Sequence, residues 1–211
     1  MFGTTSFLIW FSSNSHKRIF IYLKVHYIIG NTVQEILTFN GFKIMSDLMA
    51  PFDNLGNLSV YADTIKRNPK YFYTRPLHYY NTGSPADNPP ESCQTLEFPS
   101  NDKSPNLLSA ITNFSSTVDP FKFKILIHLL EDLHQPLHLT GKFRGGNDIK
   151  IEYKKNDTEH IYHTSLHALW DTGLFVNKFK QNTSLEIDDY FFQTSNYLYY
   201  LRVANLITFI I

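Results

Sequence analysis

The segment that most limits how this chain can fold is an apolar helical stretch that also carries many protonatable side chains. It reads FKILIHLLEDLHQPLH, from Phe123 to His138, and it holds three histidines and two acids within eleven residues. His128 and Asp132 are four residues apart, so on a helix their side chains share one face and can bind a single ion. Pro136 ends the helix, and His138 then presents a further ligand from another direction.

The composition suits one domain and excludes an overall basic surface. The chain has 211 residues, of which 43% are hydrophobic, enough for one substantial core. Its 19 basic and 19 acidic residues cancel, so the chain lacks the positive field with which proteins hold duplex DNA by its backbone. Any contact with nucleic acid must therefore be local.

Apolar spacing and turn residues predict a mainly α domain with one small β element. The clearest strand signal is DIKIEY, which alternates apolar and polar side chains from Asp148 to Tyr153 and is expected to pair in a hairpin. RGGN, just before it, indicates a tight turn. A long irregular connection is expected between Pro69 and Pro105. Helices are expected at residues 17–39, ending near Asn40-Gly41, and at 45–67, 106–114, 120–134 and 158–175.

The sequence predicts no membrane span, and some features fit export. IFIYLKVHYII, residues 19–29, is interrupted by Lys24 and His26, and the apolar stretch 198–211 is short and contains Arg202. Cys93 is the single cysteine, so no disulfide forms within the chain. The opening residues lack the basic start of a signal peptide, which favours an incomplete beginning. Four glycosylation sequons fit a secretory route, at Asn57, Asn113, Asn156 and Asn182.

A second histidine–acid pair repeats the spacing of the first. His167 and Asp171 are four residues apart in the last predicted helix. One such pair is more often a surface hydrogen bond than a metal site, but two pairs that flank a proline-broken helix with His138 favour a metal centre. Imidazole and carboxylate ligands without a usable thiolate select zinc of the catalytic type. The other nearby histidines are interpreted as solvated rather than ligating: His134, His160 and His163.

Several segments together resemble the signature of one enzyme family. HLLEDLHQPLH, RGGNDIKI and LHALWDT are similar, in order and nearly in spacing, to segments of the secreted zinc-dependent single-strand nucleases of the S-one/P-one type, which includes mung bean and plant bifunctional nucleases. YADTIKR, LHYYN and DNPPESC extend the resemblance upstream, so that it covers roughly residues 60–175. The resemblance implies a single-domain helical bundle of the phospholipase C and P-one nuclease type with a small β-hairpin.

The resemblance also implies three bound zinc ions and their ligands. In the family, the acid that matches Asp132 bridges the first and third ions, and Trp10 and His16 match the pair that completes the third site. Lys66 matches a phosphate-contacting arginine, and the implied catalytic residues are Asp63, Lys66 and Asp132. The implied ligands are Asp63, His78, His128 and Asp132 for the first zinc, and His138, His167 and Asp171 for the second.

The function implied by the resemblance is hydrolysis of single-stranded DNA and RNA, as an endonuclease and 3′-nucleotidase that releases 5′-mononucleotides. Tyr79 matches an aromatic residue on which a flipped-out base stacks, and Asn81 matches a position that hydrogen-bonds the base edge. The expected partners are therefore single-stranded nucleic acid and 3′-nucleotides. We expect no membrane partner, and we expect a secreted monomer.

Two other interpretations stay open. One is a zinc phospholipase C, which shares the helical fold and the trinuclear centre, although the LHYYN base pocket argues against it. The other is a catalytically inactive remnant, because nine residues precede Trp10 and because the helices that follow Phe175 in the family, with the partner of Cys93, are absent. The expected organisation is one zinc nuclease-like domain over residues 1–211, with an uncertain N-terminal region at 1–49 and an atypical C-terminal remnant at 176–211.

Overall fold

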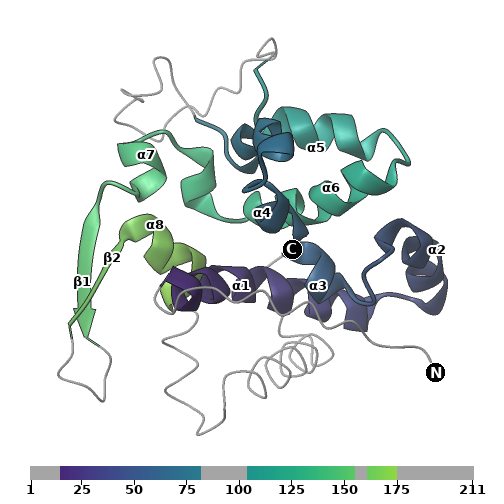
Figure 1. The fold of residues 1–211 in the computed structure, drawn as a ribbon, viewed down its shortest axis with the longest axis horizontal. Helices are drawn as coiled ribbons and strands as arrows, with labels where there is room; N and C mark the ends of the chain where they lie inside the picture. Colours follow the sequence, from purple (N-terminus) through teal and green to yellow (C-terminus); the bar gives the residue numbers. More distant parts are fainter. Residues whose placement is uncertain (1–14, 82–103, 155–160, 175–211) are drawn as a thin grey trace, which may run out of the picture.

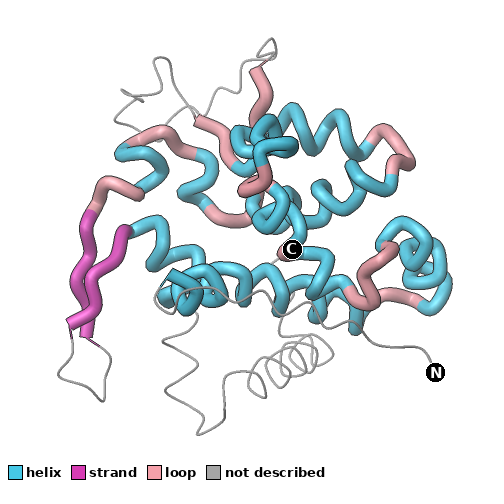
Figure 2. Tube along the Cα trace, in the orientation of Figure 1, coloured by secondary structure: helices cyan, strands magenta, loops and turns pink. Residues whose placement is uncertain are grey.

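A computed structural model describes the chain over residues 15–81, 104–154 and 161–174, with side chains from residue 25 onward. Most of the described residues lie in helices, and the described strands form one two-stranded sheet, so the mainly α fold with a small hairpin is confirmed (Figures 1 and 2). Within these ranges, no helix is both long and apolar enough to cross a membrane. The helices are α1 (Ser15–Ile36), α2 (Phe39–Met49), α3 (Leu55–Ser59), α4 (Tyr61–Ile65), the 3-10 helix η1 (Pro69–His78), α5 (Leu107–Ser115), α6 (Pro120–Asp132), the 3-10 helix η2 (Pro136–Leu139), α7 (Phe143–Gly146), α8 (Leu166–Ala168) and the π-helical turn η3 (Leu169–Gly173).

Local capping signals explain where two central helices begin. Asn106 caps α5, because its side chain accepts a hydrogen bond from the Ser109 N–H while the Ser109 hydroxyl accepts one from the Asn106 N–H. Asp119 caps α6 by accepting from the Lys122 N–H, and Pro120 occupies the first helical position, where a missing N–H breaks no helical bond. Both helices therefore begin within one residue of their predicted starts.

Helix α6 is the centre of the packing. It contacts α1, α2, α3, α4 and α5, and Figure 1 shows it running beside α5. Ile125 and Leu129 of α6 are fully buried in one core, whereas Phe123 and Ile127 of the same helix pack on a second core built from α2 and α3. Each buried aliphatic side chain contributes about 1.5–3 kcal/mol. Two cores thus hold α6 in place, and with it the side chains of His128 and Asp132.

The β-hairpin leads the chain back toward the helices. Strand β1 (Lys150–Lys154) pairs antiparallel with β2 (Ile161–Ser165), and the rings of Tyr153 and Tyr162 stack across the pair with centroids 5.4 Å apart. Figure 1 shows the hairpin at one edge of the molecule, with α8 directly after β2. Because α8 and η3 follow without a long loop, the hairpin fixes where the His167 and Asp171 side chains enter the fold.

Two predicted helices near the N-terminus have wrong limits. The helix expected to end near Asn40-Gly41 ends at Ile36, and α2 runs through Asn40-Gly41 because the Thr38 side chain caps it. The segment expected as one helix at 45–67 is divided into the end of α2, α3 and α4. Pro51 cannot continue a helix, and Asn54 starts a new one by capping α3.

Two further predictions are wrong in part. The connection expected between Pro69 and Pro105 begins with the helix η1, while residues 82–103 lie outside the described part of the chain. The helix expected at 158–175 is a strand at residues 161–165, because the backbone there hydrogen-bonds to β1 instead of to itself. His163 is therefore an exposed strand residue, with its Nδ1 3.1 Å from Oε1 of Glu152, and does not share a helical face with His167.

Candidate metal centre

A cleft of about 840 Å³ lies between helices that are far apart in the sequence. Residues from α1, α4, η1, α6, η2 and η3 line it. Histidines and carboxylates in and beneath this cleft fall into three groups, and in each group the ligand atoms lie within 4.8 Å of one another. We call them the first group (Asp63, His78 and His128), the second group (His138, His167 and Asp171) and the third group (His26, His128 and Glu131). Asp132 adjoins the first group, because one of its oxygens lies near the ring nitrogens of His78 and His128.

The first group has the spacing of a tetrahedral metal site. Nδ1 of His78 lies 2.8 Å from Oδ2 of Asp132 and 3.1 Å from Nε2 of His128. Nε2 of His128 is 3.1 Å from the same Asp132 oxygen, and Oδ1 of Asp63 lies 3.8 Å and 3.6 Å from the two ring nitrogens. Zinc bonds of about 2.0–2.1 Å place tetrahedral ligand atoms about 3.3–3.4 Å apart. These four side chains therefore fit a zinc ion.

The charges in the first group favour ionised carboxylates. Burial alone would lower the pKa of His128, but the carboxylates of Asp132 and Asp63 raise it to about 9. Burial lowers the pKa of His78 to about 4. Burial also opposes ionisation of the two acids, yet the His128 imidazolium holds the pKa of Asp132 and of Asp63 well below its usual range. At neutral pH the acids are therefore in the form that binds a cation.

Backbone carbonyls orient two of the imidazole rings. Nδ1 of His128 donates to the Ser59 carbonyl at 2.6 Å, and Nδ1 of His167 donates to the Gly145 carbonyl at 2.8 Å. Each bond leaves Nε2 without a proton in the neutral ring and turned toward a carboxylate. Metal-binding histidines in proteins commonly have this arrangement, because the second hydrogen bond fixes the tautomer and the ring orientation.

The second group is held together in the same way. Nε2 of His167 is 3.1 Å from Oδ2 of Asp171, and Nε2 of His138 is 3.5 Å from Oδ1. The two imidazole rings stack with centroids 5.0 Å apart. Oδ1 of Asp171 also accepts a hydrogen bond from the Gln135 amide at 2.6 Å. Two imidazoles and one oriented carboxylate are a donor set that fits zinc with open positions for water or substrate.

The turn that carries the Gly145 carbonyl yields a first prediction. Gly145 has φ of +61°, and a Cβ there would lie 2.7 Å from the Leu137 carbonyl oxygen. We expect Gly145→Ala to lower the free energy of unfolding by about 1–3 kcal/mol and to weaken zinc binding, because the carbonyl that orients His167 must move. Urea unfolding measures the first effect. Gly41→Ala, in α2, is the control and should change stability by less than about 1 kcal/mol; equal effects of the two variants would contradict this role of Gly145.

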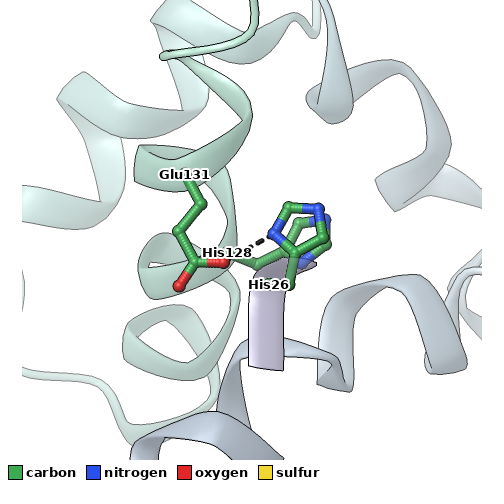
Figure 3. Close-up of side chains that lie close together, drawn as sticks. All are labelled: His26, His128 and Glu131. Atoms are coloured by element: carbon green, nitrogen blue, oxygen red, sulfur yellow. Dashed lines mark hydrogen bonds and ion pairs between the residues drawn. The ribbon is translucent and has the colours of Figure 1, made fainter. Parts of the chain in front are cut away.

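The third group joins α1 to α6. Figure 3 shows the His26 ring lying against the ring of His128, and their centroids are 4.0 Å apart. Nδ1 of His26 is 2.5 Å from Oε2 of Glu131, whose Oε1 accepts a hydrogen bond from the Ser59 hydroxyl at 2.7 Å. Nε2 of His26 faces Oδ1 of Asp132 at 3.5 Å. Glu131 thus holds one ring nitrogen of His26 while the other points to the first group.

Asp132 lies where the three groups meet. Its Oδ2 contacts the two histidines of the first group, whereas its Oδ1 is 3.3 Å from Nδ1 of His138 and 3.5 Å from Nε2 of His26. Its side chain is only 2% exposed. One oxygen of this buried carboxylate therefore faces the first group and the other faces His138 and His26. This arrangement is suited to bridging two cations.

The structure places most of the predicted site residues at this cleft. Lys66 lines it with its ammonium group paired to Asp63, and the exposed side chains of Tyr79 and Asn81 line it as well. The predicted ligands that the structure brings together are Asp63, His78, His128, Asp132, His138, His167 and Asp171.

Two of the predicted ligands of the third zinc, Trp10 and His16, stay untested, because the structure does not describe their side chains. Trp10, Cys93 and His160 lie outside the described residues, and the side chain of His16 is not described. His16 belongs to α1, ten residues before His26, which is about 15 Å along a helix axis. His134 is exposed, as expected, and its Nδ1 donates to the Leu130 carbonyl.

The sequence interpretation missed His26 and Glu131. In the sequence, His26 stands out only as an interruption of an apolar stretch. A histidine in the middle of a buried helix needs a polar partner, and that requirement was the available signal. The partner, Glu131, lies 105 residues away, so spacing along the chain could not identify it.

The fold and these three groups define the class of the protein. It is mainly helical, and its cleft is lined by histidines and carboxylates in the pattern of a multinuclear metal centre. A family model described as S1/P1 Nuclease matches residues 24–204, and the chain therefore belongs to this family. The match includes His26 and Glu131 and leaves Trp10 and His16 outside it.

Three curated relatives illustrate the similarity. Nuclease S1 of Aspergillus oryzae is 29% identical over 130 residues, which are 57% of this chain and 42% of the relative. Endonuclease 2 of Arabidopsis thaliana is 25% identical over 171 residues, 71% of this chain and 54% of the relative. Nuclease P1 of Penicillium citrinum is 27% identical over 127 residues, which are 56% of this chain and 44% of the relative. The chain spans about half the length of the curated relatives it matches.

Proposed function

We propose that this chain is a zinc-dependent phosphodiesterase that hydrolyses single-stranded DNA and RNA as an endonuclease, and 3′-nucleotides, to 5′-mononucleotides. The observation that carries the proposal is the position of Asp132 between three groups of ligand atoms in one cleft. The names of the relatives, nucleases and endonucleases, support the same chemistry.

We assign three zinc ions to the cleft. Asp63, His78, His128 and Asp132 are the ligands that we propose for the first, and His138, His167 and Asp171 for the second. For the third we propose His26 with Asp132, in the role that the family resemblance implies for His16, with Glu131 positioning the His26 ring. When bound, zinc supplies a Lewis acid that activates water and neutralises the charge of a phosphodiester.

The remaining cleft residues suit a nucleotide. We assign Asp63, Lys66 and Asp132 as catalytic residues: the two acids would hold the cations, and the Lys66 ammonium, beside Asp63, adds positive charge to the cleft. Tyr79 is 43% exposed at the cleft and offers its ring to a base, while the Asn81 amide can hydrogen-bond a base edge. Bases are hidden inside a duplex, so such a site favours single strands.

We also propose that the protein follows a secretory route. Of its sequons, those at Asn57 and Asn113 lie in the described structure, and both asparagines are exposed. Exposed asparagines in this motif are accessible to glycosylation.

Zinc binding should release protons at neutral pH. His128 and His138 each have a pKa of about 9 because nearby carboxylates outweigh the effect of burial, so both are protonated at pH 7 in the zinc-free protein. Zinc needs neutral imidazoles. We therefore expect zinc affinity to rise with pH from 7 to 9 and proton release to decline above 9. Calorimetry in buffers of different ionisation enthalpy measures the release, and His138→Ala should release one proton fewer per chain. Zinc binding without proton release at pH 7 would contradict this charge state.

The proposed function is tested on zinc-reconstituted protein with four substrates: denatured DNA, duplex DNA, a 3′-mononucleotide and phosphatidylcholine vesicles. We expect cleavage of denatured DNA well above duplex DNA, phosphate release from the 3′-nucleotide, and 5′-mononucleotides as products by mass spectrometry. Choline phosphate release alone would support a phospholipase instead. Binding of zinc with no turnover of any substrate would show a catalytically inactive member of the family.

A further inference from the structure

We propose that Arg75, supported by Phe72, forms a phosphate-binding subsite for a flanking nucleotide of a single strand, beside the metal groups. This inference rests on the proposed function and extends it, because it assigns to the cleft a second contact that only a polynucleotide can fill.

The Arg75 side chain is held in place by two contacts. Its Nε–H donates to the Lys66 carbonyl at 2.9 Å, and its guanidinium carbon lies 3.5 Å from the centroid of the Phe72 ring. Stacking on an aromatic ring and a backbone hydrogen bond both reduce the freedom that arginine loses on binding a ligand. Arg75 is therefore preorganised although it is exposed.

The two terminal nitrogens of Arg75 are available to a ligand. Within the described part of the chain, neither nitrogen makes a hydrogen bond or an ion pair, and Arg75 lines the same cleft as Asp63 and His78. Paired N–H groups in one plane match the geometry of two phosphate oxygens. The ligand class that this side chain recognises is thus a phosphate group.

The other cations at the cleft are less suited to this role. The Lys66 ammonium is paired with Asp63, and Arg144 is paired with Asp148 at 3.0 Å. Arg67 also lines the cleft, but no contact described in the structure fixes its guanidinium. Arg75 alone among these four cations combines free terminal N–H groups with a fixed position.

Exposed aromatic rings in and directly after the helix that carries Arg75 favour a single strand over an isolated phosphate. Phe72, Tyr73 and Tyr79 are 41%, 60% and 43% exposed, and all three belong to η1 or the residue after it. A basic group interleaved with exposed aromatic rings is the usual surface for single-stranded nucleic acid, because bases stack on rings while cations follow the backbone. A 3′-mononucleotide has one phosphate, which the metal groups would hold, so it has no second phosphate to place on Arg75.

The test compares Arg75→Ala and Arg75→Lys with wild-type protein, all loaded with zinc. With an oligonucleotide substrate, we expect kcat/KM to fall about tenfold for Arg75→Ala, as for loss of a hydrogen bond to a charged group, mainly through KM. Hydrolysis of a 3′-mononucleotide should not change. Arg75→Lys should recover part of the loss, because it keeps the charge but not the paired N–H groups.

Binding provides a second readout that does not depend on turnover. For a phosphorothioate oligothymidylate, the slope of log Kd against log salt should fall by about 0.7 in Arg75→Ala, as expected for loss of one phosphate contact to a single strand. Lys43→Ala is the matched control, since it removes an exposed cation on α2 that does not line the cleft. Thermal melting verifies that each variant is folded.

The outcomes separate this inference from the proposed function. Equal losses on both substrates, or no change in oligonucleotide kcat/KM and salt slope, would overturn the subsite while leaving the nuclease activity of the wild-type protein intact. A wild-type protein that cleaves no nucleic acid, yet binds it with a salt slope that depends on Arg75, would refute the proposed function and support the subsite.

Discussion

Asp132→Asn should abolish turnover and remove more than one zinc ion from the protein. Asp132 contacts His78 and His128 through one oxygen, and His26 and His138 through the other. Replacing a residue that only supports a metal ligand typically costs 10–100-fold in affinity or activity, so loss of a shared ligand should cost more than about 100-fold. Zinc content by mass spectrometry and kcat on denatured DNA measure the two effects.

Asp47→Asn is the control for this substitution. Asp47 is an exposed acid on α2 that does not line the cleft, so its replacement should change neither zinc content nor kcat. If Asp132→Asn kept its full zinc content and cleaved DNA at the wild-type rate, the carboxylate would not join the groups, and the proposed metal assignment would be wrong.

Glu131→Gln should weaken only one of the zinc sites, by about 10–100-fold. The Glu131 carboxylate lies 2.5 Å from Nδ1 of His26 and is 7% exposed, so in the folded protein it fixes the ring whose other nitrogen faces Asp132. Glutamine keeps the size of the side chain and removes its charge. Zinc titration by calorimetry should therefore show one weakened site and two sites near their wild-type affinities.

The hairpin contains a matched control for Glu131→Gln. Glu152 also pairs with a histidine, His163, at 3.1 Å, but both side chains are largely exposed and lie outside the cleft. Glu152→Gln should leave all zinc affinities unchanged. Equal weakening of every site by Glu131→Gln would indicate a general loss of structure, and no weakening would show that the His26 ring needs no support.

The parts of the fold that the sequence predicted well are those with local causes. Asn106 and Asp119 cap their helices through hydrogen bonds to residues three positions later, so the starts of α5 and α6 were readable from spacing alone. The alternation of DIKIEY likewise predicted β1. The prediction of helix for its partner strand is wrong, because only pairing with β1 decides the conformation of residues 161–165.

The candidate site shows the same division. The pairs His128/Asp132 and His167/Asp171 were visible because ligands four residues apart share a helix face, and both pairs do lie at 3.1 Å. Asp63 and His78 were predicted from family resemblance, since no rule of spacing connects them to α6. Neither ligand spacing nor family resemblance indicates His26, because the position of its side chain depends on the packing of α1 against α3 and α6.

Anomalous diffraction at the zinc absorption edge, on crystals of the zinc-reconstituted protein, tests the central claim most directly. The claim predicts one peak among Asp63, His78, His128 and Asp132, a second among His138, His167 and Asp171, and a third between His26 and Asp132. Zinc peaks elsewhere on the protein, with none among these side chains, would contradict the claim.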